Sequence, residues 1–178
     1  LADMKRSAMR RLVYNSQVAS KINITNQDAK NYYDSNLIQI TTEYHLALIW
    51  IDNKEQAEGV LKKIQSGVDF ETVARTVVGK KETAGRDPWD RGFLSWGQIP
   101  FDFVETIGKM KPSEVIGIFN SRQPGYPIFK LLGVRKNPKA DFESLSADIM
   151  NRLRSKEVAG AYDQYVEKLK KDAKIEKF

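Results

Sequence analysis

The single histidine, His45, and the absence of cysteine limit the chemistry that this sequence supports. Without cysteine the chain has no thiol nucleophile, no thiol redox centre and no disulfide framework, and a zinc site of mixed histidine and cysteine ligands is excluded. A Ser-His-Asp triad would have to use His45. We therefore expect neither a metal nor another cofactor. His45 itself has two interpretations, a catalytic residue or a structural residue on a half-buried strand.

Apolar and aromatic side chains are the other candidates for a site, because they bind rather than react. The candidates for the lining of a peptide groove are Leu94, Trp96 and Tyr126. The alternative is that they are ordinary core or helix-face residues. The net charge of +6 is spread over several predicted helices. We interpret it first as solvated surface and second as attraction to acidic partners.

Hydrophobic periodicity predicts an alternating series of helices and strands that must position these residues. Thr25, Asn53 and Asp69 each precede a helical pattern as a capping residue does. Helical spacing predicts helices at 1–22, 25–35, 54–65, 70–78, 101–107 and from 139 onwards. Strand signals occur at 41–51, 92–96, 115–119 and 126–134, and the aperiodic segment 79–91 is predicted to be a loop.

The order of these elements predicts an α+β fold. Four short strands between unequal helices favour a four-stranded antiparallel sheet with surrounding helices. The terminal helices lie outside that region and need a surface for their apolar stripes, so we expect them to pack against each other. The predicted segments are 1–40, 41–136 and 137–178. No apolar run reaches 18 residues, and the start at Leu1 within a predicted helix indicates a processed or trimmed product.

The middle segment resembles a parvulin-type (rotamase, PpiC-like) peptidyl-prolyl isomerase domain. The matching pieces are Tyr44–Ile49, Gln65–Phe70 with Val73 and Ala74, Arg91–Gly97 and Gly125–Lys130. The flanking helices are similar to those of the SurA and PrsA family of extracytoplasmic foldases, and the run Trp96–Ile99 resembles the SurA branch. This resemblance implies a periplasmic chaperone in which the terminal helices form a helical chaperone module.

The resemblance also implies roles for individual residues. His45 matches the first of the family's paired histidines, and Ile99 and Phe103 match the residues that grip the proline ring. At the second histidine position, expected opposite His45, the chain has Pro127, which has neither a polar side chain nor a backbone N–H. Lys80 is nearest to the position where the family has cysteine or aspartate. We therefore expect weak or absent isomerase activity.

Three functions follow from these observations. The first is a SurA-like chaperone for unfolded or extended polypeptides, above all outer-membrane or secreted proteins, with aromatic-rich segments as ligands. The second is an active parvulin-type peptidyl-prolyl cis-trans isomerase with a rearranged pocket. The third, a nucleic-acid-binding domain, is suggested by charge alone and has no recognisable motif. We expect neither a nucleic-acid partner nor an integral membrane segment.

Overall fold

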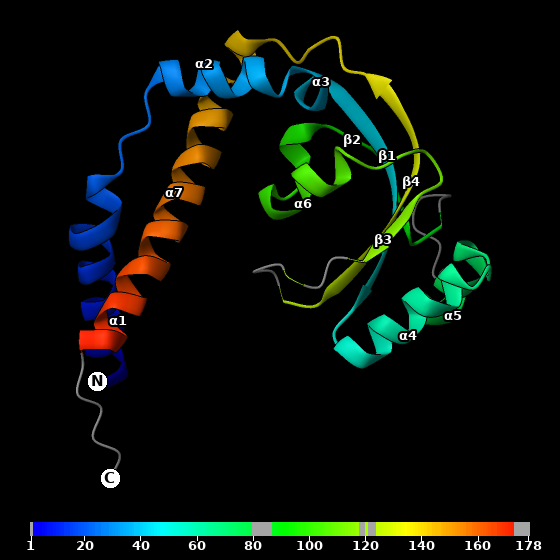
Figure 1. Ribbon diagram of the computed structural model, residues 1–178, viewed down its shortest axis with the longest axis horizontal. Helices are drawn as coiled ribbons and strands as arrows, with labels where there is room; N and C mark the ends of the chain where they lie inside the picture. The colour runs from blue at the N-terminus through cyan, green and yellow to red at the C-terminus, as the bar shows by residue number, and fades with distance from the viewer. Residues whose placement is uncertain (1, 80–86, 118–119, 121–123, 173–178) are drawn as a thin grey trace. The chain divides into compact units, whose positions relative to one another are not determined.

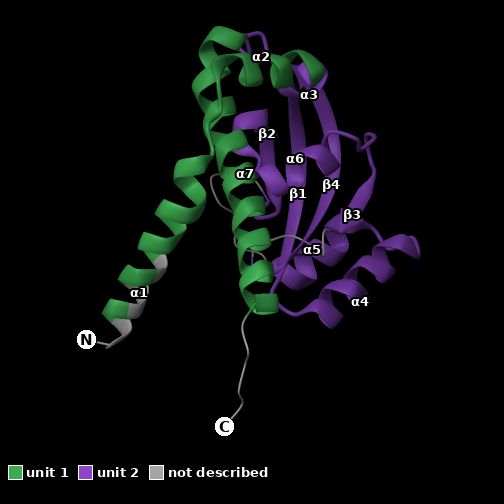
Figure 2. Cartoon of the chain, turned by 60° about the vertical axis from the view of Figure 1, so that its left-hand side comes forward, with its two compact units in different colours: residues 1–35, 142–178 green, residues 36–141 purple. Residues whose placement is uncertain are grey.

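The structure is a computed structural model that describes residues 2–79, 87–117, 120 and 124–172. The chain divides into two compact units, coloured separately in Figure 2. The helical unit combines Leu1–Ser35 with Phe142–Phe178, and the sheet unit is Asn36–Asp141.

The helical unit consists of α1 (Ala2–Val13), α2 (Asn26–Ser35) and the long α7 (Phe142–Asp172). Edge-to-face ring contacts join its two chain segments, with Tyr14 5.5 Å from Tyr162 and Tyr33 5.6 Å from Phe142 between ring centroids. Aromatic pairs in this geometry add to the free energy gained by burial. Its buried apolar residues are Val18, Ala29, Tyr33, Ile149 and Val158.

The first predicted helix differs from the observed one beyond Val13. A π-helical turn, Tyr14–Val18, follows α1, and a 3-10 turn, Ala19–Lys21, follows that. Asn15 and Ser16 are poor helix formers because their side chains compete with the helical hydrogen bonds of the backbone. The wider turn ends at Val18, which is buried. Apolar spacing alone did not predict this change of helix type.

The sheet unit contains four strands in the order β2-β1-β4-β3, and all neighbouring strands are antiparallel. Figure 1 shows α4 and α5 on one side of the sheet and α6 on the other. The strands are β1 (Thr42–Ile51), β2 (Asp90–Leu94), β3 (Val115–Gly117) and β4 (Tyr126–Lys136). The helices are α3 (Leu37–Ile40), α4 (Lys54–Gln65), α5 (Phe70–Val78) and α6 (Phe101–Ile107).

Two of the predicted helix caps are present in the sheet unit. Asn53 accepts a hydrogen bond from the Gln56 N–H at 2.9 Å, and Asp69 accepts one from the Thr72 N–H at 2.9 Å. Each bond satisfies a backbone donor that the first helical turn leaves free. The helix α3 was not predicted, because four residues are too few to show a period.

Two β-bulges interrupt the pairing of β1 with its neighbours. On β4, His45 pairs with Gly133 and Leu46 pairs with Leu131, so Leu132 is the extra residue. On β2, His45 pairs with Phe93 while Ala47 pairs with Asp90, so β2 also carries one residue too many. Because both extra residues lie on the partner strands, β1 itself keeps its regular alternation of side chains.

Candidate functional site

The two faces of the sheet have different surroundings. Ala47, Ile49 and Ile51 of β1 belong to a buried cluster with residues of α4 and α5, which we call the helix-pair face. Successive side chains of a strand point to opposite faces, so Leu48 and Trp50 point the other way. On that side the Phe103 ring of α6 lies 5.5 Å from the Phe129 ring of β4. We call it the α6 face.

The α6 face brings together two of the residues predicted to bind substrate, Leu94 and Phe103, and Ile99 lies in the chain just before α6. Ile99 and Phe103 are each 1% exposed. Tyr44 points to the same face as Leu48, because the two residues are four apart on β1. Leu94 is the cross-strand partner of Tyr44, so it lies on this face too. Trp96 is also buried, in a 3-10 turn that precedes α6. Ile99 and Phe103 are therefore packed into a closed apolar layer rather than lining an open slot.

His45 lies on the helix-pair face. Side chains alternate along β1, so the His45 side chain points to the same face as Ala47 and Ile49 and away from the face of Leu48. Its Nε2 lies 2.8 Å from Asp90 Oδ1, which also accepts the Gly92 N–H at 2.7 Å. The structure therefore does not bring His45 together with Ile99 and Phe103, and it gives the imidazole a structural hydrogen bond.

An aromatic and charged cluster surrounds this histidine. The Phe93 ring lies 4.9 Å from the His45 ring, and the Arg135 guanidinium lies 4.0 Å from the Phe93 centroid. Arg135 Nε in turn donates to Glu43 Oε2 at 2.5 Å. These contacts tie β2, β1 and β4 together at the rim of the helix-pair face.

The expectation that Pro127 lies opposite His45 is wrong. Pro127 pairs with Trp50, and His45 pairs with Gly133. Pro127 is fully buried, on the same face as Phe129, two residues along β4. The β1 side chains next to it on this face are Trp50, its direct partner, and Leu48, the partner of Phe129. A polar side chain able to act together with residue 127 would therefore have to stand at position 48 or 50 of β1. Leu48 and Trp50 occupy these positions, so neither supplies a titratable group.

Two further predicted residues do not join the α6 face. Tyr126 pairs with Ile51 and packs against the buried cluster of the helix-pair face. Lys80 lies outside the described residues. Residues that act together across two strands must share a face and a register, and the register is known here from the observed pairing of β1 with β4. Applied to β1 and β4, that rule selects Leu48 and Trp50.

The α6 face can bind apolar groups, and it supplies little polar chemistry. Between Tyr44 and Trp50 on β1, the residues of this face are apolar apart from the Tyr44 phenol. Burial raises the pKa of Tyr44, whose hydroxyl donates to the Gln39 carbonyl at 3.5 Å. Within the part of the chain that the structure describes, no group of three or more histidine, cysteine, aspartate or glutamate side chains could hold a metal ion.

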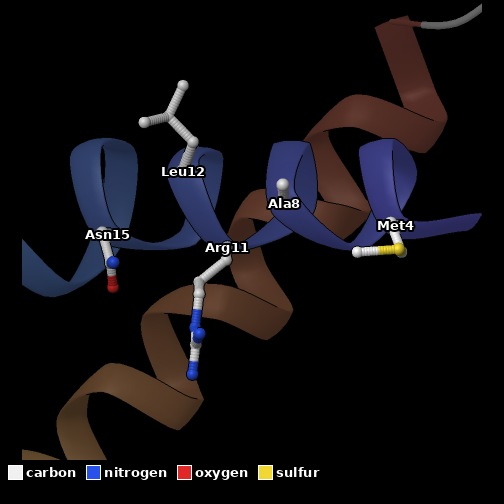
Figure 3. A pocket seen from close by; sticks show the side chains of 5 residues that line it. All are labelled: Met4, Ala8, Arg11, Leu12 and Asn15. Carbon is white, nitrogen blue, oxygen red and sulfur yellow. The ribbon is translucent and has the colours of Figure 1, made fainter. Parts of the chain in front are cut away.

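The helical unit carries a second candidate surface. A hollow of about 670 Å³ lies along α1 and the turn after it, as Figure 3 shows. It is lined by Met4, Ala8, Arg11, Leu12 and Asn15. Met4 and Leu12 are largely exposed. An exposed apolar stripe beside an arginine can contact segments that are both apolar and acidic.

Comparison with known proteins identifies the family to which the chain belongs. The family of the PPIC-type PPIASE domain matches residues 24–147, which is more than half of the chain. The chain belongs to this family. The match includes all four strands of the sheet, and it confirms the parvulin-like α+β fold expected from the sequence.

Curated relatives are foldases. The chain is 28% identical to the foldase protein PrsA of Clostridium acetobutylicum over 187 residues, which cover 99% of this chain and 55% of the relative. It is 26% identical to a PrsA of Clostridium botulinum over 171 residues, covering 92% of this chain and 49% of the relative. The chain thus spans about half the length of the curated relatives that it matches.

A solved structure of a PrsA shares the fold. PrsA from Bacillus anthracis matches with a TM-score of 0.51 and 20% identity, over 99% of this chain and 77% of that one. One of two structurally related SurA-like chaperones of Campylobacter jejuni matches with a TM-score of 0.44 and 15% identity, over 99% of this chain and 73% of that one.

Proposed function

We propose that this chain is part of an extracytoplasmic foldase of the PrsA and SurA type, which holds unfolded exported polypeptides. In this proposal its parvulin-type domain binds clients and isomerises proline weakly or not at all. The observation that carries it is the composition of the α6 face, where Leu48, Trp50 and Pro127 are neighbours across β1 and β4. Of these three side chains, only Trp50 has a hydrogen-bond donor, its indole N–H. Leu48 and Pro127 have none that could bond to a strained amide.

The energetics of the reaction support this view of the domain. Rotation about the peptide bond has a barrier of about 18 to 20 kcal/mol, which arises from amide resonance. A catalyst must therefore bind the twisted amide more tightly than the planar one. An apolar layer binds both forms of a proline ring nearly equally, so it favours binding over acceleration. His45 cannot assist from the opposite face of the sheet.

Client binding has a second surface in the helical unit. The exposed residues Met4, Met9 and Leu12 of α1 offer flexible apolar contacts. The exposed Lys5 and Arg11 on the same helix favour clients with acidic segments. We propose secreted or outer-membrane proteins in the unfolded state as the clients. No helix in the described ranges is both long and apolar enough to cross a membrane.

The test of this function is suppression of aggregation. A denatured porin and a denatured secreted enzyme are diluted into buffer with the whole chain at stoichiometric ratio, and light scattering is followed. We expect slower scattering with the chain than with an equal mass of an unrelated protein. The double variant Met4→Ser/Leu12→Ser should retain less of this effect. Scattering that is unchanged by the wild-type chain would rule the chaperone function out.

The alternative function is an active peptidyl-prolyl isomerase. It is favoured by the family match and by the packing of Phe103 beside Phe129. A protease-coupled assay with a short Xaa-Pro peptide distinguishes the two functions. We expect a rate close to that of the uncatalysed reaction. A rate that increases linearly with the concentration of the chain would establish the alternative.

A further inference from the structure

The helix α1 exposes its apolar side chains to solvent. Met4 is 74% exposed, Met9 63% and Leu12 65%. Of the α1 side chains that the structure describes, none is buried and only Val13 is half-buried. The first buried residue in the described part of the chain is Val18, in the turn that follows α1. The apolar residues of α1 therefore form a surface and not a part of the core.

Two methionines border this surface. An α-helix turns by about 100° per residue, so Met9 lies about 140° around α1 from Met4. Ala8 and Leu12 fall between the two, and Figure 3 shows both beside Met4 along the hollow. The two thioethers thus stand at the two margins of one exposed apolar stripe.

Exposure decides which methionines a dissolved oxidant reaches. The chain has four methionines, and the other two, Met110 and Met150, are half-buried. With hydrogen peroxide, the lone pair of the sulfur attacks one peroxide oxygen, the S–O bond forms and the O–O bond breaks. Sulfur loses two electrons, peroxide gains them, and after proton transfer the second oxygen leaves as water. The product is a sulfoxide, a polar side chain that sulfoxide reductases convert back to methionine.

We propose that Met4 and Met9 are sites of reversible oxidation by hydroperoxides, and that their sulfoxides weaken client binding at α1. This inference rests on the proposed function, because it names a regulation of the surface that the proposed function assigns to α1. A thioether makes flexible apolar contacts, whereas a sulfoxide oxygen accepts hydrogen bonds and must lose its water when an apolar segment covers it. Oxidation of both leaves Leu12 as the one largely exposed apolar side chain among the described residues of α1.

The experiment follows oxidation and function in the same sample. The whole chain is treated with hydrogen peroxide, the reaction is stopped with catalase, and each methionine is followed by mass spectrometry of proteolytic peptides. We expect Met4 and Met9 to be oxidised several times faster than Met110 and Met150. Chain oxidised at Met4 and Met9 alone should suppress aggregation of the denatured porin several-fold less than untreated chain. Thermal melting should not change, because neither side chain is buried. Treatment with methionine sulfoxide reductases and a thiol reductant should restore the suppression.

Two double variants separate these sulfurs from the others. Met4→Leu/Met9→Leu keeps apolar side chains at both margins without a thioether, so it should suppress aggregation before and after peroxide treatment alike. Met110→Leu/Met150→Leu is the matched control, because it removes the same number of sulfur atoms elsewhere. It should lose suppression on oxidation as the wild type does. Circular dichroism checks the fold of each variant.

Four results would overturn the inference. If oxidised and untreated chain suppress aggregation equally, the methionines do not regulate α1 and the proposed function stands. If untreated chain suppresses no aggregation, both fail. If Met4→Leu/Met9→Leu remains sensitive to peroxide, or if oxidation lowers the melting temperature, the loss arises elsewhere in the fold. Equal oxidation rates at all four methionines would contradict the selectivity expected from exposure.

Discussion

The two faces of the sheet share the same strands and differ in nearly every other respect. The helix-pair face has a dry core beneath α4 and α5, and at its rim a polar cluster of His45, Asp90 and Arg135. Between Tyr44 and Trp50 the α6 face is apolar apart from the Tyr44 phenol, and Trp50 is exposed. The lone histidine and its charged neighbours therefore lie on the face away from Phe103. The difference teaches that a histidine on β1 can be assigned to a site only when the face of the sheet to which its side chain points is known.

The largest effect that we predict concerns the closed part of the α6 face. Phe103→Ala removes a fully buried ring against Phe129, and it should lower the free energy of unfolding by about 3 to 5 kcal/mol. Phe93→Ala, at the exposed rim of the other face, should lower it far less. Urea denaturation measures both. Equal losses would mean that Phe103 lines an open slot and not a packed layer.

A second prediction restores imidazoles on the α6 face. Leu48→His combined with Pro127→His places two histidines on one face of neighbouring strands. In the protease-coupled assay we expect about a tenfold higher rate than the wild type, which corresponds to about 1.4 kcal/mol of barrier. Pro127→His alone should give no gain, because His45 is on the other face.

The control for this prediction is His45→Ala in the background of the double variant. It should leave the new activity unchanged. A gain from Pro127→His alone that is lost with His45→Ala would show instead that His45 and residue 127 act together, and it would contradict the assignment of faces.

A third prediction concerns the role of the lone histidine. His45→Ala removes the hydrogen bond to Asp90 and should lower the free energy of unfolding by about 1 kcal/mol. Suppression of aggregation of the denatured porin, measured by light scattering, should not change. Asp90→Ala should destabilise more than His45→Ala, because Asp90 also accepts the Gly92 N–H. Loss of aggregation suppression in a folded His45→Ala variant would instead indicate that the histidine contacts clients.

The smallest effect is the pH dependence of the cap on α5, a helix of the helix-pair face. The hydrogen bond from the Thr72 N–H holds the pKa of Asp69 below its ordinary value. Stabilisation from this carboxylate is therefore present above the ordinary value and is lost as pH falls through the lower folded-state value. The stability difference between wild type and Asp69→Ala, from urea titrations, should be largest near neutral pH and shrink in acid. A difference that grows in acid would contradict this sign.

Much of the fold could be predicted from the sequence, because it depends on local signals. The bounds of α6 agree with the predicted 101–107, and the cap at Asn53 forms as expected. The face of His45 could not be predicted, because alternation in β1 defines two faces without saying which of them α6 covers. The pairing of Pro127 with Trp50 rather than with another residue of β1 depends on the extra residue Leu132 in β4. A bulge of this kind cannot be recognised from the pattern of apolar residues.

The bulge on β2 has a consequence for self-association. β2 is an edge strand of the sheet, with Gly92 at φ +67 and a charged, exposed Arg91 beside it. An irregular, charged edge is a poor template for strand addition, whereas a long flat edge invites neighbouring chains to extend the sheet. A protein proposed to hold extended polypeptides meets such chains constantly. If the proposed function holds, the irregular edge at β2 disfavours pairing of such a polypeptide with this strand.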